Sequence, residues 1–371
     1  MKIAIYSNTF YLISGGDVIY ANLAKQFLSQ KHQVTIITNE KGRDFCLSQN
    51  VPEKSILVQK SSWIDRYPLV FVEVYKTIIS TTRELFATRQ APQVIFSSSF
   101  FLPDLVPAVI AQIKNPKSKL VVGIYLLFPS IFSFKKYHGG QLKLLLLHFS
   151  QKLSLFLVNI FADLVLTASE RDVKHFKNAI AIRGGVDFKR IKQIKNKGKK
   201  YDLVYFGRFH SQKGLLDLLD IWHKVYQKRP STNFLMIGAG PLEEEMKTKA
   251  MSLNFLDKIT FTGILSGVKK YKYLKSSRIF TSASRFDTGN MALDETLACG
   301  TPGVVYNLEH LNYPHGVVKV PIGNKTKMKN EILKLLSNTY TRSALGKEGK
   351  EFIKHYDWQI ISKKILNTFY N

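Results

Sequence analysis

The chain has 371 residues, a length sufficient for two domains. Of these residues 45% are hydrophobic, 22% charged and 12% aromatic, and this composition excludes intrinsic disorder. Its two cysteines, Cys46 and Cys299, are too few for a disulfide framework or a cysteine-based zinc cluster. The 54 Lys and Arg against 27 Asp and Glu leave a net charge of +27, which favours partners that carry phosphate groups.

The N-terminal half alternates strand patterns with helical patterns. Lys2–Ser7 and Gln33–Thr38 are short apolar runs that predict strands buried on both faces, and a helical pattern over Val18–Leu28 lies between them. Val94–Ser97 and Leu120–Tyr125 are predicted as two further strands. This alternation indicates βαβ units and a parallel, doubly wound sheet.

The same alternation begins again after a basic tract at residues 189–200. Five strands and three helices are predicted there: Asp202–Phe206, Asn233–Ile237, Lys258–Phe261, Arg278–Thr281 and Gly303–Tyr306, with Gly214–Tyr226, Leu242–Met251 and Met291–Ala298. The sequence therefore predicts an α/β fold of two Rossmann-like halves joined near residue 190. We interpret the basic tract as a solvated linker between them, with a phosphate- or lipid-facing patch as the alternative.

The most specific segment is Ser282–Pro302, SASRFDTGNMALDETLACGTP. It places Asp287 and Glu295 eight residues apart, and a helix is predicted to begin between them, at Asn290 or Met291. Backbone N–H groups at a helix start, preceded here by a glycine, form an anion site. Glu295 would lie about one turn inside the helix, where its carboxylate can accept hydrogen bonds from sugar hydroxyls.

This segment resembles the Glu-x7-Glu region and the following A-x-G-T-P of retaining glycosyltransferases of family 4, which have the GT-B fold. Five further motifs agree with that family in the expected order: Gly15-Gly16, Gly184–Asp187, Gly207–Gly214, Ile237–Leu242 and Phe261–Gly263. The resemblance implies two Rossmann-like doubly wound domains facing a central cleft. It assigns residues 1–188 to the acceptor side and 189–356 to the nucleotide sugar, with a C-terminal helix of about 357–371 packing back on the first domain.

The activity implied by the resemblance is transfer of a hexose from a UDP- or GDP-sugar to a hydroxyl, with retained anomeric configuration. The acceptor is expected to be a glycan that is lipid-linked or part of the cell envelope. Such a site must stabilise the negative charge that develops on the departing diphosphate. Because the sequence contains no Asp-x-Asp, we expect no metal and no other cofactor. We assign the stabilisation of the diphosphate charge to Arg208 and Lys213.

Other residues receive roles from the same resemblance. Asp287 is expected to orient the donor sugar and Glu295 the ribose, beside the backbone of Gly289, Asn290 and Met291. Five glycines are expected to let the donor or acceptor approach the backbone: Gly238, Gly240, Gly263, Gly15 and Gly16. For the last two, an ordinary tight turn is an equal alternative. A nicotinamide fingerprint is rejected at Gly238-x-Gly240, because Glu243 stands where its third glycine would be.

Two departures from the family pattern keep a second interpretation open. The first acid is Asp287 rather than Glu, so its side chain is roughly 1.3–1.5 Å shorter. Tyr125-Leu126 stands where the family usually has a histidine near the donor sugar. A non-catalytic relative that binds a sugar nucleotide is therefore the first alternative. A nucleic-acid binder, supported by charge alone and by no recognised module, is a distant second.

Two segments are candidates for membrane contact. Leu142–Ala162 is apolar around most of its circumference and is interpreted as a buried helix, with an interfacial helix beside Lys135, Lys136 and Lys143 as the alternative. Ser61–Ala87 is a second aromatic and basic candidate. Because no signal peptide or spanning segment is predicted, we expect a cytoplasmic protein with peripheral contact to an anionic membrane.

Overall fold

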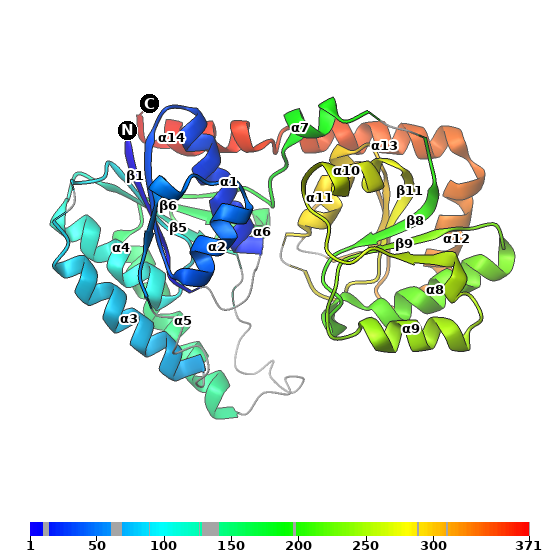
Figure 1. The fold of residues 1–371 in the computed structure, drawn as a ribbon, viewed down its shortest axis with the longest axis horizontal. Coiled ribbons are helices and arrows are strands. Elements are labelled where there is room, and N and C mark those ends of the chain that lie inside the picture. The colour runs from blue at the N-terminus through cyan, green and yellow to red at the C-terminus, as the bar shows by residue number, and fades with distance from the viewer. Residues whose placement is uncertain are drawn as a thin grey trace. The chain divides into compact units, whose positions relative to one another are not determined.

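The computed structural model describes residues 1–9, 15–60, 69–88, 90–125, 127, 141–195, 198–287, 289–308 and 311–370. The chain divides into two compact units (Figure 1). Unit 1 comprises residues 1–183 together with 361–371, and unit 2 comprises residues 184–360. Each unit is built around its own parallel sheet.

Unit 1 has a seven-stranded sheet in the order β3-β2-β1-β4-β5-β6-β7, and every pair in it is parallel. The strands are β1 (Lys2–Ser7), β2 (Gln33–Thr38), β3 (Ile56–Val58), β4 (Val94–Ser97), β5 (Lys119–Ile124), β6 (Leu164–Thr167) and β7 (Ala179–Ala181). The strand order reverses direction between β1 and β4, which makes their carboxyl ends the topological switch point of this sheet.

Helices cover this sheet. They are α1 (Gly15–Ser29), α2 (Glu40–Ser48), α3 (Leu69–Leu85), α4 (Leu102–Lys114), α5 (Gln141–Phe161) and α6 (Glu170–Val173), with a short 3-10 helix η1 (Glu53–Ser55). The last helix, α14 (Trp358–Tyr370), begins in unit 2 and ends in unit 1. In unit 1, Gln30 Nε2 donates to Ser362 Oγ on α14 at 2.8 Å.

Unit 2 repeats the arrangement with six parallel strands in the order β10-β9-β8-β11-β12-β13. The strands are β8 (Tyr201–Phe206), β9 (Phe234–Ile237), β10 (Ile259–Phe261), β11 (Ser277–Ser282), β12 (Gly303–Tyr306) and β13 (Val317–Val320). The helices are α7 (Phe188–Gln193), α8 (Leu215–Lys228), α9 (Glu243–Ser252), α10 (Gly267–Lys275), α11 (Met291–Ala298), α12 (Lys325–Ser337) and α13 (Thr339–Lys354), with 3-10 helices η4 (Ser211–Lys213) and η5 (Leu256–Lys258). The two sheets confirm the predicted α/β class with two doubly wound, Rossmann-like halves.

The apolar strands of unit 2 separate two hydrophobic cores. Side chains alternate along a strand, so Leu203 and Tyr205 enter one core cluster while Val204 enters the other. On the first side, Trp222 stacks on Phe234 with ring centroids 4.9 Å apart, and its Nε1 donates to Thr281 Oγ1 at 3.0 Å. This buried hydrogen bond links α8 to β11. Burial on both faces explains why these strands are continuous apolar runs.

The basic tract is part of unit 2, and its interpretation as a linker is wrong for the described residues. Residues 188–193 form α7, where Ile191 is 1% exposed. Lys199 Nζ donates to the carbonyl oxygens of Lys275 and Ser277 at 2.9 and 2.6 Å. The boundary between the units lies at residue 183 instead. The two apolar residues of the tract, Ile191 and Ile194, are buried, which a count of its charges conceals.

The long apolar helix of unit 1 is not buried all round. Among the described side chains of α5, Phe149, Phe156 and Ile160 are 69%, 61% and 58% exposed. The side facing the protein carries Gln151, Ser154 and Val158, all buried, while Leu155, Leu157 and Phe161 pack partly buried against the core. The preferred interpretation of this segment as a buried helix is therefore wrong for its outer side. Within the part of the chain that is described, no helix is long and apolar enough to cross a membrane.

Candidate functional site

Two loops meet at the switch point of unit 2, where β8 lies beside β11. The loop after β8 runs through Arg208 to η4, and Phe209 anchors it because this side chain is fully buried. The N–H of Phe209 donates to Ala239 O at 2.9 Å, and Tyr205 Oη donates to Arg208 O at 3.1 Å. These bonds hold the backbone of the loop against the sheet. Its charged side chains are thereby presented at the carboxyl end of the strands.

Gly214 explains how the two loops come close enough to share a site. Its φ of 61° is left-handed, and a Cβ at this position would lie 2.1 Å from Ala283 O. A larger residue would push the loops apart. Next to this contact, Gln212 O accepts hydrogen bonds from Arg285 N and Ser284 Oγ, both at 3.3 Å. Packing between the two loops thus requires the glycine of the family's Lys-Gly pair in this chain.

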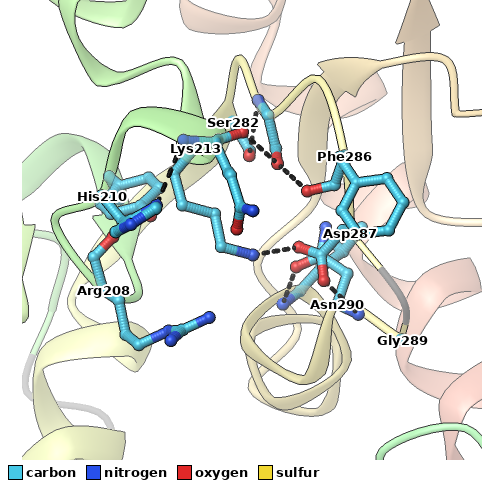
Figure 2. A network of polar contacts seen from close by, with 12 residues as sticks. Arg208, His210, Lys213, Ser282, Phe286, Asp287, Gly289 and Asn290 are labelled. Atoms are coloured by element: carbon cyan, nitrogen blue, oxygen red, sulfur yellow. Dashed lines mark hydrogen bonds and ion pairs between the residues drawn. The ribbon is translucent and has the colours of Figure 1, made fainter. Parts of the chain in front are cut away.

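An ion pair joins the two loops (Figure 2). Lys213 Nζ lies 2.7 Å from Asp287 Oδ2, and the two side chains are 17% and 13% exposed. Asp287 Oδ1 accepts a hydrogen bond from Asn290 N at 3.3 Å. One carboxylate therefore links a lysine on the first loop to the start of α11 on the second. Although Asp287 is shorter than the family's glutamate, it makes both contacts.

The predicted helix start is confirmed at Met291. Asn290 precedes it with a left-handed φ of 41°, and its Oδ1 accepts from Leu293 N at 3.2 Å as the N-cap. Met291 packs on Gly184, where a Cβ would lie 2.2 Å from Met291 Cγ. Gly289 O accepts from Tyr313 Oη at 3.5 Å, and Thr288 lies outside the described residues. The backbone at this helix start is thus fixed by the Asn290 cap, by packing of Met291 on Gly184 and by the hydrogen bond from Tyr313.

Arg208 contributes a second cation. Its side chain is exposed, and Figure 2 shows it extending from the same loop as Lys213 toward the loop that carries Asp287. Burial raises the pKa of Tyr205 beneath the loops; the charge of Asp287 raises this pKa further, and that of Arg208 lowers it. The charges of Asp287 and Arg208 thus shift the pKa of one buried group in opposite directions.

Glu295 is engaged by two residues of α10 that the sequence analysis did not identify. Lys270 Nζ lies 2.7 Å from Glu295 Oε1 and 2.7 Å from Oε2, and Tyr271 Oη donates to Oε1 at 3.1 Å. Lys270 also lies over the Phe206 ring, 5.2 Å from its centroid. Burial and the Glu295 charge raise the pKa of Tyr271, so this hydroxyl keeps its proton and acts as a donor. Nothing in the spacing of 25 residues predicts this pairing.

The glycines of the site have different surroundings. A Cβ on Gly238 would lie 1.9 Å from Gly207 O, and one on Gly240 would lie 2.4 Å from Phe209 O. These two positions are required by packing between the loops after β8 and β9. By contrast, a Cβ on Gly263 would meet nothing within 4 Å, so its backbone borders open space. In unit 1, Gly15 and Gly16 are the first two residues of α1.

The position of the missing family histidine is partly described. Tyr125 directly follows β5, and its hydroxyl lies 3.1 Å from that of Tyr20, while Leu126 lies outside the described residues. Burial raises the pKa of both tyrosines.

Lys135, Lys136 and the stretch 61–68 of the second membrane candidate also lie outside the described residues. No group of three or more His, Cys, Asp and Glu in the described ranges could hold a metal ion.

Residues 187–352 match the family model of glycosyl transferases group 1. This region belongs to that family. The match contains all of the unit 2 site: both loops, α10 and α11. The predicted family relationship is therefore confirmed on the segment that carries the site.

Curated relatives of this group 1 region align with part of their length only. The chain is 25% identical over 173 residues to a phosphatidyl-myo-inositol mannosyltransferase of Mycobacterium leprae, 45% of this chain and 46% of the relative. It is 27% identical over 110 residues to an alpha-monoglucosyldiacylglycerol synthase of Streptococcus pneumoniae, 30% of this chain and 25% of the relative. The alignments thus span half or less of the length of these relatives.

Solved structures extend the likeness to both units. Anabaena HepE in complex with UDP-glucose is similar with a TM-score of 0.71 over 99% of both chains, at 14% identity. At this identity the likeness concerns the fold alone. It confirms the expected GT-B fold.

The glycine contacts lead to a stability prediction. Gly238→Ala should lower the free energy of unfolding by about 2 kcal/mol or more, because the new Cβ collides with Gly207 O and the φ of 142° strains a side chain. Gly263→Ala should cost only about 1 kcal/mol, the strain of its left-handed backbone. Denaturant unfolding of both full-length variants measures the difference. Equal losses would contradict the packing role of Gly238.

Proposed function

We propose that this chain is a transferase that moves a hexose from a UDP- or GDP-sugar to a hydroxyl of a lipid-linked or cell-envelope glycan. The reaction retains the anomeric configuration and uses no metal. The observation that carries the proposal is that Lys213 and the start of α11 meet at Asp287, with Arg208 on the same loop as Lys213, at the switch point of the sheet. Ligands of doubly wound sheets bind at such points.

The electrostatics of this convergence suit a departing diphosphate. Breaking the bond between the anomeric carbon and the phosphate oxygen leaves negative charge on that oxygen. Arg208 supplies a planar fork of donors, Lys213 a compact charge, and the N-terminus of α11 a partial positive charge. Lys213 is also partly shielded from water, which strengthens its interaction with an anion. In many transferases a divalent ion has this task, and here protein cations are proposed for it.

The proposed chemistry takes place on one face of the sugar. As the bond to phosphate breaks, the acceptor oxygen attacks the anomeric carbon through an oxocarbenium-like transition state. The acceptor proton passes to the departing phosphate oxygen. Asp287, held by Lys213 and Asn290 N, is proposed to orient the sugar rather than to attack it. Glu295, oriented by Lys270 and Tyr271, is proposed to accept hydrogen bonds from the ribose hydroxyls.

The comparisons support the classes of donor and acceptor. HepE was solved with UDP-glucose bound, which favours a uridine sugar nucleotide among the donors. The curated relatives are named for a phosphatidylinositol and a diacylglycerol lipid, which favours a lipid-linked acceptor. The proposed place of action is the cytoplasm, at the surface of a membrane.

Turnover tests the assignment of the site. Lys213→Ala and Glu295→Ala should each lower the transfer rate about 100-fold or more, because each removes an interaction with the donor at the reacting end or at the ribose. Lys347→Ala, an exposed lysine on α13, is the matched control and should keep the wild-type rate. Release of UDP or GDP with a lipid extract as acceptor, in buffer containing a chelator, measures the rate. The anomeric configuration is read by NMR, and near-normal rates in both site variants would contradict the assignment.

A matched pair on α10 tests the role of Lys270. Lys270→Met should weaken donor binding about tenfold, because Glu295 loses the cation that holds both of its oxygens. Lys272→Met, an exposed lysine on the same helix, should leave binding unchanged. Lys270→Arg should restore most of the affinity. Calorimetric titration gives the dissociation constants, and equal affinities for Lys270→Met and Lys272→Met would refute the positioning role.

The non-catalytic alternative predicts a different result with the wild-type chain. A binding protein would show donor affinity without transfer and without slow hydrolysis of the donor. The shorter Asp287 and the tyrosine at position 125 are the features that favour it.

A further inference from the structure

Unit 1 has an exposed apolar stripe along α3. Phe71, Val74, Ile78 and Leu85 are 68%, 53%, 57% and 54% exposed. Their spacing of three, four and seven residues places them on one side of the helix, over a length of about 21 Å. Thr82 interrupts the row between Ile78 and Leu85. Soluble proteins rarely leave several large apolar side chains on one side of a helix in water without a partner for them.

A second stripe runs along α5. Phe149, Leu153, Phe156 and Ile160 are 69%, 41%, 61% and 58% exposed, again at spacings of three and four residues. The opposite side of α5 packs onto the protein through Gln151, Ser154 and Val158, and Leu155, Leu157 and Phe161 are partly buried against the core. This helix therefore carries large apolar residues on its outer side as well as on the side that faces the protein.

The two helices belong to one layer. Figure 1 shows α3 and α5 near each other in unit 1, and α3 packs against both α4 and α5. Ser150 Oγ on α5 donates to Glu73 Oε1 on α3 at 2.8 Å. A single flat partner can therefore contact both helices.

The charges around the stripes have one sign. The sequences of α3, α4 and α5 contain three acidic residues, Glu73, Glu84 and Asp104, and all three are buried. The exposed charged side chains among the described residues of these helices are basic: Arg83, Lys114 and Lys152. Unit 1 as a whole has 24 Lys and Arg against 11 Asp and Glu. Such a surface repels a second copy of itself and attracts an anionic one.

We propose that the stripes of α3 and α5 dock on a lipid bilayer that contains anionic lipids. The phenylalanines and aliphatic side chains enter the boundary between headgroups and acyl chains, and Arg83 and Lys152 contact the lipid phosphates. This docking deepens the place of action given under the proposed function, and its test needs neither a nucleotide sugar nor turnover. If both proposals hold, it brings unit 1 to the surface where a lipid-linked acceptor lies.

Vesicle sedimentation of the full chain tests the proposal. Wild type should bind vesicles of phosphatidylcholine with phosphatidylglycerol much more tightly than vesicles of phosphatidylcholine alone. The double variant Phe149→Asn/Phe156→Asn should lose at least tenfold in affinity, because its apolar contact with the bilayer is removed. Met251→Asn/Tyr340→Asn changes two exposed apolar residues of unit 2 and should bind like wild type. Circular dichroism verifies that all variants are folded.

The charge contribution has its own variants. Arg83→Gln and Lys152→Gln should each weaken binding about fivefold at low salt, whereas Lys327→Gln and Lys347→Gln in unit 2 should not. The proposal would be overturned if wild type did not bind anionic vesicles, or if the stripe variants bound them as tightly as wild type. A wild-type dimer that the stripe variant converts to a monomer, without vesicle binding, would also overturn it. Titration with UDP-glucose and GDP-mannose, made on the same samples, tests the donor site separately.

Discussion

The ion pair between Lys213 and Asp287 depends on a constraint of topology. The parallel strands β8 and β11 are neighbours in the sheet although 70 residues lie between the end of β8 and the start of β11. The sheet therefore brings together the loops at their carboxyl ends. Gly214 permits the approach, and the pair then fixes the second loop to the first at 2.7 Å. Because Asp287 also accepts from Asn290 N, the start of α11 is positioned by the same contact. The placement of Glu295, one turn into that helix, follows from it.

Each carboxylate of the site is held by a lysine from another element: Asp287 by Lys213 and Glu295 by Lys270. Both pairs are largely shielded from solvent, so removal of either lysine would leave an unpaired, partly buried charge. A sugar nucleotide that enters such a site finds hydrogen-bond acceptors already oriented, which reduces the entropy cost of binding. Close packing of the loops at Gly207, Gly238 and Gly240 supports that orientation.

The features predicted from the sequence were those with a local signal. Strands such as β1, β8 and β12 are buried on both faces, form continuous apolar runs and were predicted. The edge strands β3, β7 and β13, of three or four residues each, and the buried strand β6 were not predicted. The Asp287 and Glu295 segment was identified by its motif. Lys270 was not, because the partner of a buried carboxylate is set by packing between α10 and α11. The exposed stripe of α5 corresponds to the alternative interpretation and not to the preferred one, since composition alone does not distinguish a buried apolar helix from one that also faces outward.

Calorimetric titration of UDP, GDP, ADP and their sugar conjugates into the full chain, in magnesium-free buffer, tests the central claim most directly. The claim is that Lys213, Arg208 and the start of α11 bind the diphosphate of a nucleotide sugar without a metal. It predicts micromolar or tighter binding for one base, and loss of that binding in Lys213→Ala. Binding that appears only when magnesium is added, or that is unchanged in Lys213→Ala, would contradict it.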